Sequence, residues 1–103
     1  MIIVYTRNSV PIRISQERWR HIASRHPEME SQKERVVETI SDPDMIQAGD
    51  FGELLAVRFY PETPLTRKHL VAAYKEASDR DGFVITAYYT SAPSKRRATI
   101  WKR

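Results

Sequence analysis

Two histidines in the first third of the chain are the side chains best suited to moving protons. His21 and His26 are candidate catalytic residues because an imidazole exchanges protons near neutral pH. They stand five residues apart, about 140° around an ideal helix, so they do not share a face as a zinc-binding pair would. No neighbouring carboxylate pattern supplies a third ligand, so no metal site is expected. His26 equally suits a structural role, in which a helix-end histidine binds the last carbonyls.

A second group of polar side chains lies in the second half of the chain, in segments that alternate like strands. If the strands pair in register, these side chains converge on an open, cationic and hydroxyl-rich sheet face. Arginine grips a phosphate through two bonds, lysine acts as a point charge, and tyrosine stacks on a base or donates a proton. The same residues also fit an ordinary solvated face, since threonine and tyrosine favour strands. The group comprises Arg58, Tyr60, Lys75, Thr86, Tyr88 and Thr90.

Basic residues are in surplus, with a net charge of +4 and a pI of about 9.6. Three of them, Lys95, Arg96 and Arg97, form a run that would bind a nucleic-acid backbone. An ordinary surface loop explains the run equally well. The charge therefore favours a polyanionic partner without requiring one.

Two helices are predicted in the first half of the chain. Ser15 suits an N-cap for a helix over residues 16–25, and Trp19 and Ile22 supply its apolar positions before Pro27 ends it. Residues 31–34, Ser-Gln-Lys-Glu, form a capping-box pattern that opens a second helix over residues 32–41. The short connection predicts a helical hairpin.

Strand signals surround this helical pair. Two short strands, 2–5 and 11–14, precede it as a hairpin or one irregular edge, and strands near 45–47, 53–60, 69–75, 83–90 and 99–102 follow it. We therefore expect one α+β domain over residues 1–103, with the two-helix unit packed on one face of an antiparallel, roughly four-stranded sheet built after residue 44. Leu55, Val57 and Phe59 are expected to form the core, which leaves Arg58 on the open face with little packing reason to exist.

Composition excludes several classes of protein. Cysteine is absent, which rules out disulfides and thiol nucleophiles, and no glycine-rich phosphate loop occurs. No cofactor is expected. No apolar run approaches the roughly 18 residues of a spanning helix, and no signal peptide is recognisable, so we expect a cytoplasmic protein that does not contact membranes.

Several strings resemble one family of small nucleases. The opening helix carries Glu17-Arg18-Trp19-Arg20-His21-Ile22, followed by His26-Pro27-Glu28-Met29. Weaker matches are Asp42-Pro43-Asp44, Val84-Ile85-Thr86-Ala87-Tyr88 with Thr90, and Ile100-Trp101. Together they make residues 11–102 similar to a phage- and bacteria-associated nuclease family of the barnase–EndoU–colicin–RelE-like (BECR) ribonuclease superfamily.

The resemblance implies two helices on a four-stranded antiparallel sheet and metal-independent RNA cleavage on the sheet face. Many relatives act as toxins or as cargo of mobile elements, so an antitoxin or inhibitor protein is a conceivable partner. Carried over residue by residue, the resemblance assigns catalysis to His21 or His26, Arg58, Lys75, Thr86 and Thr90, without choosing between the histidines.

Two hypotheses follow. In the first, the chain is an endoribonuclease in which the RNA 2′-OH attacks the neighbouring phosphorus, with Tyr60 or Tyr88 stacking on a base. In the second, it is a non-catalytic RNA-binding or partner-binding module of the same fold, which uses the basic face and needs neither histidine.

Overall fold

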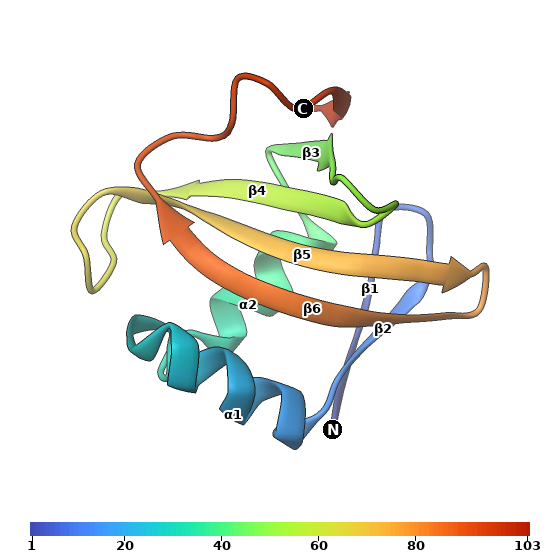
Figure 1. Ribbon diagram of the computed structural model, residues 1–103, viewed down its shortest axis with the longest axis horizontal. Coiled ribbons are helices and arrows are strands. Elements are labelled where there is room, and N and C mark those ends of the chain that lie inside the picture. Colours follow the sequence, from blue (N-terminus) through green and yellow to red (C-terminus); the bar gives the residue numbers. More distant parts are fainter.

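The computed structural model describes all 103 residues, Met1 to Arg103, and shows an α+β fold. A β-hairpin comes first, two helices follow, and five further strands complete the chain (Figure 1). The elements are β1 (Ile2–Tyr5), β2 (Pro11–Ile14), α1 (Gln16–Arg25), the 3₁₀ turn η1 (Pro27–Met29), α2 (Lys33–Ser41), β3 (Met45–Ala48), β4 (Leu54–Tyr60), β5 (Lys68–Ser78), β6 (Asp81–Thr90) and β7 (Thr99–Lys102).

The sheet has seven strands in the order β1-β2-β6-β5-β4-β3-β7. All neighbours are antiparallel except β2 and β6, which run parallel where Arg13 lies opposite Phe83. The expectation of a four-stranded antiparallel sheet built after residue 44 was therefore wrong. The amino-terminal hairpin joins β6 through a pairing between residues 70 positions apart, which local patterns do not reveal.

Both predicted helices are confirmed, but only one of the predicted caps is. The Ser15 hydroxyl accepts a hydrogen bond from the backbone N–H of Arg18 at 3.0 Å and opens α1. The capping box at Ser31 was wrong, because α2 begins at Lys33 and Gln32 is its N-cap without a side-chain cap. Gln32 instead accepts a hydrogen bond from the Tyr89 hydroxyl at 2.6 Å, which ties the start of α2 to β6.

Apolar side chains are buried on both faces of the sheet. The larger cluster faces the helices and includes Ala56 and Tyr60 of β4. The smaller cluster, on the opposite face, consists of Leu55, Val57, Val71 and Ala73. The expected orientation of β4 was therefore inverted: its even-numbered residues face the main core, and its odd-numbered residues face the other side.

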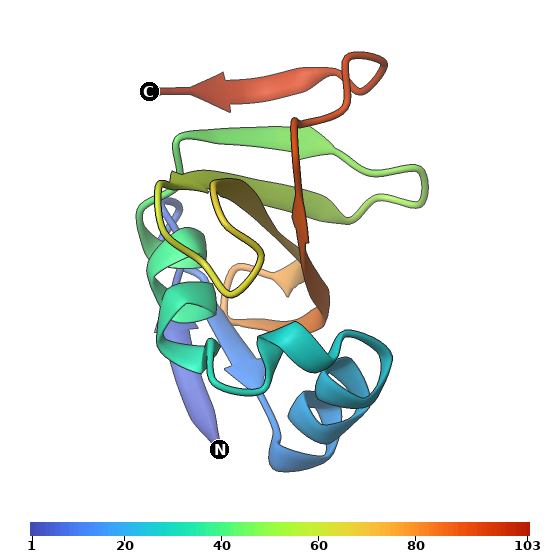
Figure 2. The ribbon, with the colours of Figure 1, turned by 90° about the vertical axis from the view of Figure 1, so that its left-hand side faces the viewer.

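Residues 91–98, which we call the crossover segment, pass over the face opposite the helices. They leave β6 and reach β7 at the far edge of the sheet, past β5, β4 and β3. The Gln47 amide nitrogen donates to the Ser94 carbonyl at 2.8 Å, and the Ala48 N–H donates to the Ala98 carbonyl at 2.9 Å. Figure 2 shows this segment, in red, on the side of the sheet away from α2. The expected open face is thus partly covered. Neither helix has the length and apolar run that crossing a bilayer requires.

Candidate functional site

His26 and Tyr88 meet beside β6. Their ring centroids lie 5.8 Å apart with a tilt of 34°. Helix α1 runs along β6, where Arg18 donates a hydrogen bond to the Ile85 carbonyl at 3.4 Å, and α1 ends at His26 because Pro27 follows. The His26 ring is half-buried, with Nδ1 3.7 Å from a Glu28 carboxylate oxygen. The ring therefore faces the sheet rather than the last carbonyls of its helix.

Three predicted site residues of β6 share the face opposite the helices. Thr86, Tyr88 and Thr90 lie across from Ala73, Val71 and His69 of β5. An irregularity near Ile85 shifts the register by one residue, so the alternation that unites these three residues begins at Thr86 and does not include Val84, which lies in the helix-facing cluster. The structure thus brings His26, Tyr88, Thr86 and Thr90 to one region, as a row of hydroxyls with an imidazole beside it.

His69 belongs to the same region, although it was not among the predicted site residues. It lies directly opposite Thr90, so its side chain is a close cross-strand neighbour. Its Nδ1 is 3.3 Å from the Ser91 carbonyl, and its ring is 5.1 Å from that of Phe59. The strand alternation that places Val71 and Ala73 on one face also includes His69, which was the signal available in the sequence.

A lysine stands at the same end of the sheet. The Lys68 ammonium donates a hydrogen bond to the Ser91 hydroxyl at 2.9 Å, directly after Thr90. Predicted Lys75 lies on this face too, but it pairs with Phe83, and its Nζ is 3.5 Å from the Phe51 carbonyl. Six residues of strand, roughly 20 Å, separate Lys75 from His69, so the structure does not bring Lys75 to the His26–Tyr88 region.

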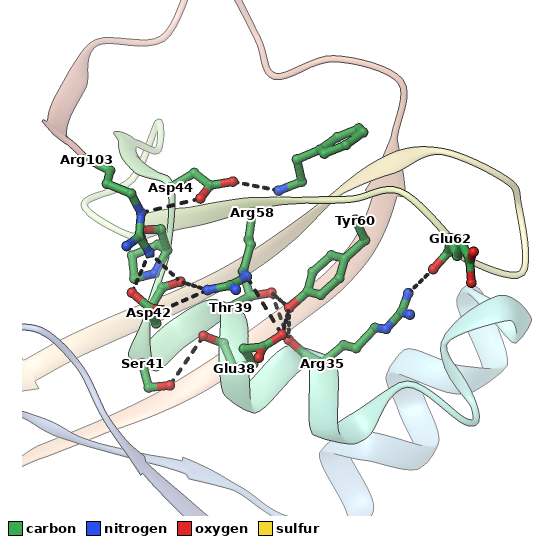
Figure 3. A network of polar contacts seen from close by, with 12 residues as sticks. Arg35, Glu38, Thr39, Ser41, Asp42, Asp44, Arg58, Tyr60, Glu62 and Arg103 are labelled. Carbon is green, nitrogen blue, oxygen red and sulfur yellow. Dashed lines mark hydrogen bonds and ion pairs between the residues drawn. The ribbon is translucent and has the colours of Figure 1, made fainter.

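Arg58 and Tyr60 lie on the opposite, helix-facing side of the sheet. Figure 3 shows Arg58 among the carboxylates of α2 and of the turn that follows it, with the Tyr60 ring alongside. Tyr60 donates a hydrogen bond to Glu38 at 2.7 Å, and burial raises the pKa of its phenol far above the ordinary value. The expectation that Arg58 has little packing reason to exist was wrong, since its guanidinium binds Asp42 at 2.9 Å and lies 3.7 Å from Glu38.

The carboxyl-terminal residue, Arg103, binds to the same group of carboxylates as Arg58. Arg103 forms ion pairs with Asp42 and with Asp44, and its backbone N–H donates to the Asp44 carbonyl at 2.8 Å. The hydrogen bonds from Arg58 and Arg103 hold the pKa of the Asp42 carboxyl below its usual value of 3.8. This network links the end of α2 to β4 and to the end of β7, which is a structural role.

His21 and the basic run complete the predicted residues. His21 is exposed on α1, and its side chain makes no hydrogen bond or ion pair. Arg97 pairs with Asp50 at 3.1 Å. Lys95 and Arg96 are exposed on the crossover segment without an ion pair, so their charges remain available to a polyanion.

The region around His26 and Tyr88 combines side chains that can exchange protons with side chains that can form hydrogen bonds. It offers two imidazoles, a phenol and two threonine hydroxyls, with a lysine at one end. No three histidine, aspartate or glutamate side chains are grouped so as to hold a metal ion. Comparison of the chain with protein-family models, with curated proteins and with solved structures found no match in any of the three.

Proposed function

We propose that the protein is a metal-independent endoribonuclease whose active site lies at His26, Tyr88 and Thr90, with His69 across the strand. The observation that carries this proposal is the contact between the His26 and Tyr88 rings at 5.8 Å, on the sheet face that also carries Thr86, Thr90 and His69. Proton transfer to a phosphodiester needs groups on both sides of the phosphorus. His69 lies opposite Thr90 and His26 lies beside Tyr88, so there is an imidazole at each end of this row of side chains.

The reaction is an internal transesterification of RNA. One imidazole removes the proton of the ribose 2′-OH, whose oxygen then forms a bond to the adjacent phosphorus. The bond from phosphorus to the 5′-oxygen of the next nucleotide breaks, and the second, protonated imidazole donates a proton to that oxygen. The products are a 2′,3′-cyclic phosphate and a 5′-hydroxyl, so no water is consumed in the step.

Charge on the phosphorane is met by donors at the same end of the sheet. The Thr90 hydroxyl donates to the Ala92 carbonyl at 3.1 Å and would turn from it to donate to a non-bridging oxygen, and Lys68 supplies a positive charge next to Ser91. Lys95 and Arg96 of the crossover segment attract the flanking phosphates. Arg58 has no part in this proposal, because its guanidinium is engaged by Asp42 on the other face.

The test is incubation of purified protein with a mixed-sequence RNA in the presence of EDTA, followed by analysis of the ends of the fragments. Cleavage leaving 2′,3′-cyclic phosphate and 5′-hydroxyl ends is the expected result. The same oligonucleotide with 2′-O-methyl groups should remain intact, because the attacking oxygen is then blocked. Binding of RNA without cleavage under any of these conditions would leave the binding-module hypothesis in its place.

A further inference from the structure

A pocket of about 250 Å³ lies between the crossover segment and the sheet, next to the proposed active site. Leu55 and Val71, both buried, supply an apolar floor, and Pro93 contributes from the crossover segment. Tyr88 and Thr90 line the side toward β6. The volume is below the roughly 300 Å³ at which pockets for drug-sized ligands begin, so it suits one planar ring system.

Gln47 is the buried polar side chain of this pocket, with only 3% of its surface exposed. Its amide nitrogen donates to the Ser94 carbonyl at 2.8 Å. A side-chain amide has two N–H donors and one carbonyl acceptor, so one donor and the acceptor remain. The amide oxygen and the second N–H make no hydrogen bond within the protein. No side-chain polar atom of the protein is fully enclosed without a hydrogen-bond partner, so the unbonded amide oxygen is not fully enclosed. The Gln47 amide oxygen therefore keeps exposed surface in the space that it lines, and a ligand that covered it without donating a hydrogen bond would bury it at a cost.

The orientation of this amide is determined by its neighbour. The Ser94 carbonyl can only accept, so the amide nitrogen must point toward it and the amide oxygen away from it. Rotating the amide by 180° would place two acceptors against each other. Gln47 thus offers its amide oxygen in one fixed orientation.

We infer that this pocket binds a nucleobase whose Watson–Crick edge places an exocyclic amino group beside a ring-nitrogen acceptor, adenine or cytosine, and that Gln47 selects it. In adenine and cytosine an amino donor stands beside a ring-nitrogen acceptor, which matches the free oxygen and N–H of Gln47. Held in the same orientation by the ring contacts, guanine and uracil would place a carbonyl oxygen against the amide oxygen and a ring N–H against the amide N–H. Tyr88 and the apolar floor would enclose the ring, as in other sites for single-stranded bases.

The inference rests on the proposed function, because it makes the pocket the base subsite of an RNA-cleaving centre. Tyr88 lines the pocket and also contacts the His26 ring. A base held against Tyr88 therefore places its ribose and the adjoining phosphate near His26. Cleavage would then occur next to adenosine or cytidine.

Binding of short DNA oligomers tests the subsite separately from catalysis, because DNA lacks the 2′-OH and cannot be cleaved by this route. The probes are single-stranded hexamers of deoxyadenosine, deoxycytidine, thymidine and deoxyinosine, the last in place of guanosine. We expect the first two to bind roughly 5- to 150-fold more tightly than the other two, the range of one good bidentate base contact. A hexamer of purine deoxyriboside, which lacks the amino group, should bind as weakly as thymidine.

Gln47→Leu should remove the preference, whereas Gln32→Leu, the same change on the helix-facing side, should retain it. Equal binding of all the hexamers to the parent protein would overturn the inference, as would a folded Gln47→Leu protein that keeps the preference. Should Gln47→Leu fail to fold, the comparison of adenine with purine in the parent protein decides the matter. Base preference without RNA cleavage would reject the proposed function alone, and cleavage without base preference would reject the subsite alone.

Discussion

The Arg58 guanidinium donates one hydrogen bond to the carboxylate of Asp42 at 2.9 Å and another to its backbone carbonyl at 2.7 Å. Asp42 is the C-cap that follows α2, so this arginine of β4 joins the end of the helix to the sheet. Arg103 binds the same carboxylate and carbonyl from the end of the chain (Figure 3). Arg58, which the sequence predicted to be catalytic, therefore forms structural contacts with the end of α2.

Arg58→Ala should destabilise the protein by about 1–2 kcal/mol, because it removes charge-assisted hydrogen bonds from a side chain that is only 25% exposed. Chemical denaturation measures the change. Arg13→Ala is the matched control, since Arg13 pairs with Asp81 where both side chains are about half exposed, and its loss should cost only about 0.2–1 kcal/mol. Under the proposed function the folded Arg58→Ala protein still cleaves RNA. A folded variant that does not cleave RNA would show that Arg58 is needed for catalysis.

Asp42 should make stability depend on pH in the acid range. Its pKa is lower in the folded protein than the value of 3.8 that applies to the unfolded chain, because Arg58 and Arg103 bind its ionised form. The unfolded state then binds more protons, so this contribution is complete above pH 3.8 and is lost as the pH falls through the folded-state pKa. Thermal melts of the parent and of Asp42→Asn should differ at neutral pH and converge in acid. Asp79→Asn provides a control on a carboxylate that makes no ion pair, and a parent-to-Asp42→Asn gap that stays constant from pH 7 to pH 2 would contradict the prediction.

The Tyr60 phenol should stabilise the folded protein, and this stabilisation should decrease at alkaline pH. Burial, together with the bond to Glu38, raises the pKa of its phenol above the unfolded value of 10.0. The stabilisation is therefore complete below about pH 10 and is lost as the pH rises through the folded-state pKa. Tyr60→Phe should cost about 1 kcal/mol at neutral pH through its missing hydrogen bond, and its melting temperature should fall less than the parent's between pH 9 and pH 11. Parallel alkaline decreases in both proteins would show that Tyr60 does not carry the effect.

His26→Ala should slow RNA cleavage by about 10²–10⁴-fold, the usual contribution of a general acid or base. His21→Ala is its matched control, because the His21 side chain is exposed on α1 and makes no hydrogen bond or ion pair. Single-turnover cleavage rates distinguish the two, and melting temperatures show whether each variant is folded. Equal rates for both variants would remove His26 from the mechanism.

RNA binding should weaken with salt in proportion to the number of phosphates contacted. With about three to five contacts, the logarithm of the binding constant should fall with a slope of roughly −2 to −4 against the logarithm of salt concentration for single strands. Replacing Lys95 and Arg96 by alanine should reduce the magnitude of this slope by about 1.4, that is, about 0.7 for each charge. Arg80→Ala, at the opposite end of β6, should leave it unchanged. A slope near zero for the parent protein would count against a nucleic-acid partner.

Local patterns were sufficient where neighbours in the sequence decide the structure. Ser15 caps α1 because its hydroxyl reaches an N–H three residues on, and Pro27 ends that helix through its own ring. The period-two alternation likewise predicted that Thr86, Tyr88 and Thr90 share one face of β6. Each of these outcomes depends on contacts within a few residues.

The orientation of β4 could not be predicted in this way. Alternation separates Leu55 and Val57 from Ala56 and Tyr60, but both sets are buried, so hydrophobicity does not reveal which set faces the helices. The decision depends on where α2 docks, and Arg58 finds its carboxylates only there. Burial of both faces in turn depends on the crossover segment, which covers the smaller cluster.

The sequence by itself determined the helices, the strands, the basic surplus and the types of side chain available for chemistry. Only the tertiary structure decided which of them meet. His26 and Tyr88 are 62 positions apart, and they come together because α1 packs along β6 after the amino-terminal hairpin has joined that strand. Gln47 and Ser94 meet because the crossover segment must pass over the sheet before β7 can pair with β3. Such long-range pairings follow from the packing of the whole chain, in which each contact is stabilised by others distant in the sequence.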